Sequence, residues 1–264
     1  MPEGLEAEIW RRAAQPLIGR RIERIELDKR VADPALITAV GKRIDGVRRH
    51  GKVIVVDTTG PAIGIRFGMT GRLIIDGVAP IRQLEYASGR DRSNWDRIRL
   101  WTYPESARDA PAMRMNDPRR LGRVDIDPDL SRLGPDAFEI SAAALADSLS
   151  GRRTSMKAAL MNQEVVAGLG NLCVDEVLFS AGISPMATVD AVGDAGTHQV
   201  WRAMRRRLPV MLERGGSIYG VIDPERRRNL GRCPFGRCNG SLRSDKVGGR
   251  TTVWCPAHQL VEFC

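Results

Sequence analysis

The sequence predicts an α+β protein in which one helix precedes a β-sandwich or barrel, a helical region follows, and a cysteine-rich hairpin comes last. Three observations support this prediction. A short helical pattern is followed by many short β-branched segments with turn residues between them. From Ala142 onward the apolar residues recur at helical spacing. Four of the five cysteines cluster at or after Cys233.

The composition narrows the class of protein and of partner. The 264 residues are enough for about two domains, and 42% hydrophobic with 28% charged residues are typical of a globular protein. A formal net charge of +9 favours an acidic partner, with nucleic acid first. No apolar run approaches the roughly 20 residues of a membrane span. Charged residues such as Glu6 and Arg11 interrupt the first apolar residues, so we expect no secretory signal. We therefore expect a cytoplasmic monomer, associated with the nucleoid if bacterial, that contacts no membrane.

The first half should hold one helix and the strands. A helix is expected from Pro2 to about Ala14, because apolar residues recur every four positions, and Pro16 ends it. The runs that predict strands are Arg21–Asp28, Ile44–Val47, Val53–Val56, Ile63–Phe67, Arg72–Ile75, Arg97–Trp101 and Met113–Met115. The turn-rich segment 126–135 is the expected linker, so residues 1–125 form the first domain.

The second domain, residues 136–228, should be helical. Helices are expected over residues 155–163 and 172–181, with the glycine-rich segment Val166–Asn171 between them. Backbone N–H groups at a helix start can bind phosphate, and Asn171 would add a side-chain donor. Helical hairpins with glycine turns are also common without any ligand. Residues 201–208 predict a further, basic helix that Pro209 kinks or ends.

The N-terminus carries a candidate nucleophile. Removal of Met1 would leave a secondary amine on Pro2, and an α-amino group with a pKa of roughly 7.7–8.0 is partly unprotonated at neutral pH. Such an amine can attack an electrophilic carbon and form a Schiff base, with Glu3 beside it as a proton donor or acceptor. The alternative is structural, because Pro is favoured at the first position of a helix and Glu in the first turn.

Residues 229–264 contain the most specific pattern of the chain. Cys233 and Cys238 are separated by four residues, Cys255 and His258 by two, and sixteen residues lie between the pairs. Two ligand pairs at such spacing suit tetrahedral zinc, held here by three thiolates and one imidazole. Cys264 is an alternative ligand whose spacing fits less well.

Several other residues suit contacts to DNA. Lys52 follows a glycine at the start of a strong strand, where it would be either an edge lysine or a phosphate ligand. Met69 lies between glycines at a turn, and an exposed apolar side chain there could act as a wedge between bases. The basic turn Asn116–Arg123 would otherwise be a solvated loop. Residues 248–254 predict a hairpin whose tip carries Arg250.

Taken together, the chain resembles the formamidopyrimidine-DNA glycosylase / endonuclease VIII family of bifunctional DNA repair enzymes nearly from end to end. The Gly-Leu-Gly-Asn turn combined with the hairpin is the most specific part of the match. The matching positions are Pro2, Glu3, Glu6, Glu8, Lys52, Lys157, Gln163, Val166–Asn171, Glu176, Leu178–Phe179, Ala181–Ile183, Pro185, Gly249–Thr251, Cys255–Pro256 and Gln259.

The resemblance implies a helix–two-turn–helix domain, a zinc-binding hairpin with structural zinc, and an enzyme that flips a damaged nucleotide out of double-stranded DNA. It implies that the Pro2 nitrogen attacks C1′ of the sugar, that Glu3 moves protons, and that the strand then breaks by β- and δ-elimination. The implied phosphate contacts are Lys52 at the catalytic centre and Lys157, Asn171 and Arg250 elsewhere. Met69 and Arg119 would fill the hole left by the flipped base.

The chain also departs from the family pattern. Leu5 replaces the usual proline, Leu121 replaces an aromatic void-filling residue, and His258 replaces a cysteine in a ligand set whose first pair is more widely spaced. The segment between Ser217 and the first zinc ligand is short, which leaves little room for a loop over a flipped 8-oxoguanine. Two other classes remain open, a non-catalytic DNA-binding zinc-finger protein of the same fold and an RNA-binding zinc-ribbon protein.

Overall fold

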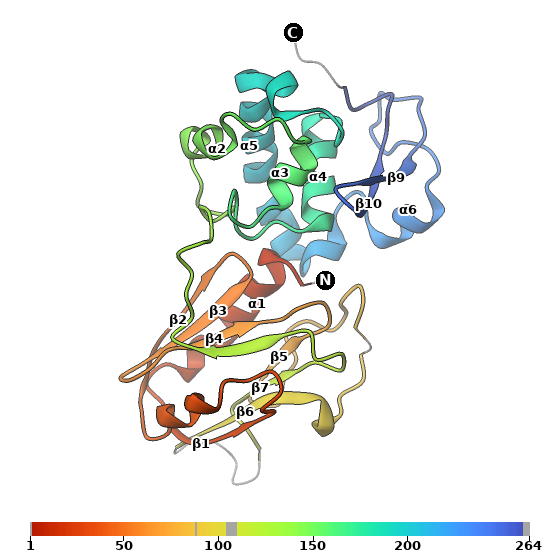
Figure 1. The fold of residues 1–264 in the computed structure, drawn as a ribbon. Coiled ribbons are helices and arrows are strands. Elements are labelled where there is room, and N and C mark those ends of the chain that lie inside the picture. Colours follow the sequence, from red (N-terminus) through yellow and green to blue (C-terminus); the bar gives the residue numbers. More distant parts are fainter. Residues whose placement is uncertain (1, 88, 104–109, 261–264) are drawn as a thin grey trace. The chain divides into compact units, whose positions relative to one another are not determined.

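The computed structural model describes residues 2–87, 89–103 and 110–260 of the chain. The chain divides into two compact units, with the boundary between Ser131 and Arg132. This boundary lies inside the segment 126–135 that was expected to be a linker. Figure 1 shows the elements of each unit. None of the helices in the described ranges is both long enough and apolar enough to span a bilayer.

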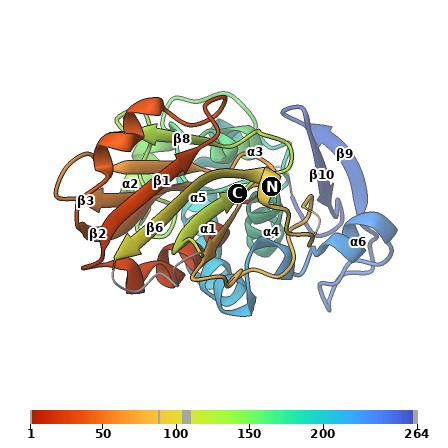
Figure 2. The same cartoon turned by 90° about the horizontal axis from the view of Figure 1, so that it is seen from below.

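The N-terminal unit contains one α-helix and the strands of two sheets. Its elements are α1 (Gly4–Ala13), η1 (Gln15–Leu17), β1 (Arg21–Leu27), η2 (Pro34–Ala39), β2 (Ile44–His50), β3 (Val53–Thr58), β4 (Ile63–Arg66), β5 (Arg72–Ile75), η3 (Ser93–Trp95), β6 (Asp96–Tyr103), β7 (Met113–Asn116) and β8 (Arg123–Ile126). The strands form two four-stranded antiparallel sheets, in the orders β1-β6-β7-β5 and β2-β3-β4-β8. Figure 2 shows β1 and β6 side by side.

The two sheets bury their inner faces against each other, so the unit is a β-sandwich, as expected. Alternate residues of β3, Ile54 and Val56, meet inward residues of the other sheet such as Ile98 and Leu100 in one core. The helix α1 adds Trp10, which is fully buried and whose ring lies 4.1 Å from that of Phe67.

The expected strands are all present, and the structure adds β8. Arg123 was placed in a basic turn, yet Arg123–Ile126 pairs with β4 along its length. This strand has only four residues, and two of them, Arg123 and Asp125, are charged and form an ion pair with each other. The apolar alternation that predicts a strand is therefore too short to recognise in the sequence.

The C-terminal unit is helical with one hairpin. Its elements are α2 (Ala142–Leu149), α3 (Met156–Met161), α4 (Asn171–Ala181), α5 (Val189–Arg214), η4 (Ser217–Tyr219), α6 (Pro224–Asn229), β9 (Arg243–Val247) and β10 (Arg250–Trp254). Gly182 ends α4 with φ of 70°, a left-handed conformation that suits glycine. Pro209 does not end a helix, which was one of the two outcomes predicted for it, because α5 continues through Pro209 to Arg214. The backbone of α5 leaves helical geometry at Gly193.

Candidate active site and nucleic-acid interface

The N-terminus of α1 is held by its own first turn. Glu3 is the N-cap and is 1% exposed. Its backbone N–H donates to Oε2 of Glu6 at 2.7 Å, and its carbonyl accepts from the Ala7 amide at 3.1 Å. Because Pro2 directly precedes this residue, the capped turn fixes the backbone that carries the candidate nucleophile.

A chain of charged groups connects α1 to the turn that carries Lys52. Glu8 of α1 accepts from Arg11 and Arg12 and pairs with Arg49 of β2, whose side chain is 4% exposed. Nη1 of Arg49 in turn donates to the carbonyl of Gly51 at 2.8 Å. Lys52 is the second residue of this two-residue turn, since His50 pairs with Val53. The fold therefore ties the middle of α1 to the turn that carries Lys52.

This ion-pair cluster shifts the ionisation of Glu8. Burial alone would raise the pKa of Glu8, but the hydrogen bonds from Arg11 and Arg12 and the charges of Arg11 and Arg49 lower it to about 2. The carboxylate is thus fully ionised at neutral pH, and the tie between α1 and β2 is permanent in that range.

Met69 and Arg119 lie on two turns in contact. Met69 is half-buried in the turn between β4 and β5, and Arg119 is exposed in the turn between β7 and β8. A side chain at Gly68 would place its Cβ 2.4 Å from the Leu121 carbonyl carbon, so only glycine allows this approach. Leu121 itself is 48% exposed. The structure therefore brings the two expected void-filling residues onto neighbouring turns.

The turn between α3 and α4 is organised by Gln163. Its Nε2 donates to the carbonyls of Met161 and Leu169, both at 2.9 Å, and its Oε1 accepts from the Gly168 amide at 3.0 Å. Gly168 has φ of 110°. The Gln163 side chain thus satisfies backbone groups that have no helical hydrogen bond in this turn. The turn ends at Asn171, which is the first residue of α4.

Lys157 is placed differently from the other expected phosphate contacts. It is fully buried, and its Nζ donates to Oδ1 of Asp175 at 2.6 Å and to Oγ1 of Thr252 at 2.7 Å. Asp175 also accepts from Arg227 at 2.6 Å and from the Val253 amide at 3.1 Å. In this arrangement the Lys157 ammonium has no exposed surface for a phosphate, and it joins α3 and α4 to the hairpin instead.

Asn171 contacts the hairpin strand that carries Arg250. Nδ2 of Asn171 and Nη2 of Arg227 both donate to the carbonyl of Thr251, each at 3.0 Å. Oγ1 of Thr252 donates to the carbonyl of Arg250 at 3.0 Å. The turn between β9 and β10 is formed by Gly248 and Gly249, so Arg250 is the exposed first residue of β10 rather than the tip.

Three of the four expected zinc ligands come together. The sulfurs of Cys233, Cys238 and Cys255 all lie within 4.8 Å of one another, and those of Cys238 and Cys255 are 3.8 Å apart. Two thiolates on one tetrahedral zinc are also about 3.8 Å apart, given Zn–S bonds of roughly 2.3 Å. The donor set and spacing therefore fit structural zinc.

His258 lies outside this cluster. Its Nε2 is 2.8 Å from the Phe179 carbonyl, and its ring stacks on Phe235 with centroids 4.1 Å apart. The neighbouring Gln259 holds the same segment to the residues that follow α4, because it accepts from the Cys255 amide and donates to the Ile183 carbonyl, both at 2.9 Å. The alternative ligand Cys264 lies outside the described residues.

Comparison with known proteins accounts for this combination of parts. Residues 1–124 match the formamidopyrimidine-DNA glycosylase N-terminal domain, and residues 133–223 match the H2TH domain of the same enzymes. The chain is 33% identical to a formamidopyrimidine-DNA glycosylase from Paracoccus denitrificans over 98% of its length and 100% of that protein. A relative of the same name from Solibacter usitatus is 31% identical over 97% of this chain and 98% of its own.

The chain belongs to the formamidopyrimidine-DNA glycosylase family. Solved structures of this family share its fold. One is the MutM (Fpg) protein from Thermus thermophilus, with a TM-score of 0.77, 24% identity, and 98% of each chain covered. Another is the Lactococcus lactis Fpg protein in complex with DNA containing an N7-benzyl-Fapy-dG, with a TM-score of 0.79, 23% identity, and 98% and 99% of the two chains covered.

Several residues that position the candidate site segments give no signal in the sequence. Asp117 and Thr70 connect the two turns of the N-terminal unit, and Asp175, Arg227 and Thr252 hold the hairpin. Asp117 lay in a segment that was interpreted only by its basic charge. The pairing of Lys157 with Asp175 spans eighteen positions, so local spacing gave no signal for it.

Proposed function

We propose that this protein is a base-excision DNA glycosylase with AP lyase activity, which removes oxidised or ring-opened bases from double-stranded DNA. The observation that carries the proposal is the placement of Pro2 directly before Glu3, the N-cap of α1, in a turn fixed by Glu6. A nucleophile that is already oriented reacts faster, because the entropy of orienting it is lost on folding and not in the reaction.

The proposed reaction starts at the secondary amine of Pro2. Its nitrogen attacks C1′ of the flipped nucleotide, the C1′–N bond to the base breaks, and the base leaves with the proton that the amine loses. Glu3 protonates the sugar ring oxygen, so the ring opens to an iminium ion. The positive nitrogen acidifies the adjacent C–H bond, and the strand breaks by β- and then δ-elimination.

The remaining site residues are proposed to bind DNA. Lys52, Asn171 and Arg250 would contact phosphates around the lesion, and their positions at a turn, a helix start and an exposed strand end suit this part. Met69 and Arg119 would fill the gap left by the flipped nucleotide. The three cysteines would hold a structural zinc that keeps the hairpin folded and supplies no chemistry to the reaction.

The lesion preference follows from the segment after α5. Ser217 is buried, and the Ile222 amide donates to Oε2 of the buried Glu176 at 3.0 Å, so this short stretch is tied down on α4. We propose that it cannot cover a large flipped purine. Single-turnover excision should therefore be faster for ring-opened purines and oxidised pyrimidines than for 8-oxoguanine, and efficient 8-oxoguanine removal would contradict this.

Borohydride trapping on abasic-site DNA tests the proposal directly. Protein with a free Pro2 should form a covalent adduct with the DNA. A preparation that retains Met1 should form none, because an acylated proline nitrogen cannot attack C1′. A C-terminally tagged preparation with a free N-terminus is the matched control. DNA binding without any adduct in both preparations would support a non-catalytic DNA-binding protein instead.

A further inference from the structure

The turns that carry Met69 and Arg119 are built as one body. Gly68 has φ of 58°, and its backbone lies against the carbonyl of Leu121. On the other turn, a Cβ at Gly122 would meet the Met115 methyl at 2.1 Å and the Arg66 carbonyl oxygen at 2.6 Å. The first turn therefore packs against the backbone of the second, and the second packs against the ends of β4 and β7.

The carboxylate of Asp117 lies between the two turns and binds both. It is fully buried. Oγ1 of Thr70, on the first turn, donates to it at 2.5 Å. The amides of Arg119 and Gly122, on the second turn, donate to it at 3.3 and 2.8 Å. The hydroxyl of Thr70 is thus the side-chain link across the gap, and a hydrogen bond to an ionised acceptor is stronger than one between neutral groups.

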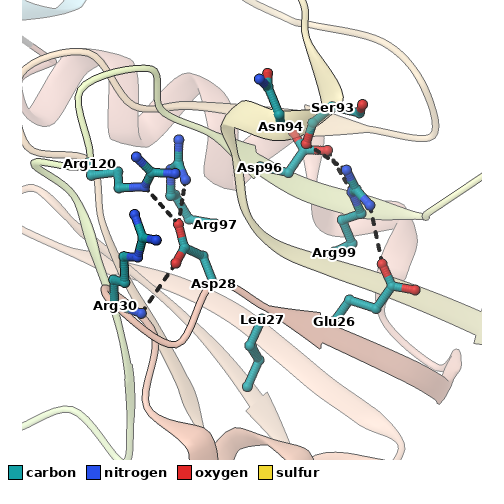
Figure 3. A pocket seen from close by; sticks show the side chains of 10 residues that line it. All are labelled: Glu26, Leu27, Asp28, Arg30, Ser93, Asn94, Asp96, Arg97, Arg99 and Arg120. Carbon is teal, nitrogen blue, oxygen red and sulfur yellow. Dashed lines mark hydrogen bonds and ion pairs between the residues drawn. The ribbon is translucent and has the colours of Figure 1, made fainter.

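The second turn is also fixed from the sheet beneath it. Nε of the buried Arg97 donates to the carbonyl of Asp117 at 2.8 Å, while its Nη1 forms an ion pair with Asp28. Asp28 also accepts from Nε of Arg120 at 3.0 Å, and the backbone of Arg120 is left-handed with φ of 53°. Figure 3 shows Arg97 and Arg120 converging on Asp28 at the side of a pocket of about 300 Å³.

Burial and the neighbouring cations act in opposite directions on Asp28. Burial alone would raise the pKa of Asp28, but hydrogen bonds from Arg120, the Arg30 amide and Arg97 lower it. The surface of the two turns combines apolar and charged side chains. Met69 is half-buried, Arg119 is exposed and Leu121 is 48% exposed. An apolar side chain held out beside a cation suits insertion into a base stack.

We infer that Asp117, acting through Thr70, is a positioning residue that makes Met69, Arg119 and Leu121 one preformed wedge. This inference rests on the proposed function and adds its mechanism of lesion access. A wedge that is ordered before binding avoids the entropic cost of ordering two loops on DNA. The binding energy then goes into unstacking the damaged nucleotide, which is the costly step for a base that is still paired.

The test removes the link between the turns without emptying the site. Thr70→Val keeps the shape of the side chain but loses the hydroxyl, and Thr70→Ser keeps the hydroxyl. Thr70→Val should lower the single-turnover excision rate of a ring-opened purine in a duplex about tenfold. Borohydride trapping at an abasic site in the same sequence should change less than about threefold, because no base remains to be unpaired. Thr70→Ser should restore excision.

A double-mutant cycle separates positioning from stability. If the two residues act as one wedge, Thr70→Val should have a much smaller effect in a Met69→Ala background than alone. Thr58→Val is the matched control, since Oγ1 of Thr58 donates to the Pro61 carbonyl in a turn at the other end of β4. Multiplicative effects in the cycle, or equal losses on both substrates, would overturn the inference.

A second variant covers the case in which Thr70→Val does not fold. Arg120 is exposed, so Arg120→Met should fold, and it removes the tie to Asp28. Arg120→Met should reduce the excision rate of the paired lesion about threefold more than it reduces trapping at the abasic site. Equal reductions on the two substrates would count against the wedge. Failure of the wild-type protein to form any adduct would refute the proposed function and is therefore measured first.

Discussion

Each unit of the protein buries one aspartate that holds a functional segment, and the two carboxylates are satisfied by different chemistry. Asp117 in the N-terminal unit accepts from the Thr70 hydroxyl and from two backbone amides. Asp175 in the C-terminal unit accepts from Lys157 and Arg227, both cations, and from the Val253 amide. One joins two turns of a sandwich, and the other joins a hairpin to helices.

The difference shows how each segment should fail. Hydrogen bonds from neutral donors can be lost one at a time, each at the cost of one unsatisfied group. A buried ion pair fails as a whole, because removal of one partner leaves a charge without compensation. The hairpin, which is also fixed by the cysteine cluster, should therefore respond to single changes more strongly than the turns.

Loss of the metal should produce the largest effect. We expect about one zinc per chain, and Cys255→Ser should remove both the metal and DNA binding, since structural zinc contributes folding energy directly. Metal analysis and a DNA-binding titration measure this, with Cys173→Ser on α4 as the matched control. Active, DNA-binding protein free of zinc would contradict the assignment of the cluster.

Removal of the charge on Asp175 should have the next largest effect. Asp175→Asn leaves the fully buried Lys157 beside a neutral group, and we expect a loss of about 3–5 kcal/mol in the free energy of unfolding. Asp117→Asn should cost less, about 1–3 kcal/mol, because its donors are neutral. Urea unfolding measures both. The double variant Asp175→Leu with Lys157→Met should recover only part of the loss, because Arg227 still loses its carboxylate partner. Equal losses for the two aspartates would contradict the different response expected of neutral and charged donors.

The sequence predicted the parts whose signal is local. The sandwich followed from alternation and from turn residues, and the cysteine cluster followed from spacing. The order of strands in the two sheets could not be predicted, because pairings such as β1 with β6 join residues more than seventy positions apart, Ile25 with Leu100 among them. The helix through Pro209 also escaped prediction, since packing of its neighbours Leu208 and Met211 in the core outweighs one lost hydrogen bond.

Side-chain partners were harder to predict than side-chain positions. Lys157 was expected at a phosphate and is buried in an ion pair, because a lysine in an amphipathic helix gives no sign of an acid on the next helix. His258 had the right spacing for a ligand, yet the Phe179 carbonyl and the Phe235 ring are its partners in this structure. Spacing fixes which residues can meet, and packing decides which of them do.

An acid titration tests the charged contacts of Glu8 in the N-terminal unit. Glu8 is bound by arginines, whereas Asp117 accepts from a hydroxyl and from backbone amides, which are uncharged donors. The pKa of Glu8 is about 2 in the folded protein against an ordinary value of 4.5, so its stabilising contribution is fully present above pH 4.5. The contribution, at most about 3 kcal/mol, should decline as the pH falls from 4.5 toward 2. Glu8→Gln should flatten the unfolding free energy over that window, while Glu23→Gln on the exposed face of β1 should not.

The smallest effect concerns the two cations of the C-terminal unit that were both expected at phosphates. Arg250 is exposed at the start of β10, and Arg250→Ala should reduce the slope of log affinity against log salt by about one unit. Lys157→Met should leave this slope unchanged, because the ammonium is buried against Asp175. Binding titrations between low and moderate salt distinguish the two. A slope that falls for Lys157→Met would show that DNA draws Lys157 out of its ion pair, and an unchanged slope for Arg250→Ala would mean that the hairpin does not contact the backbone.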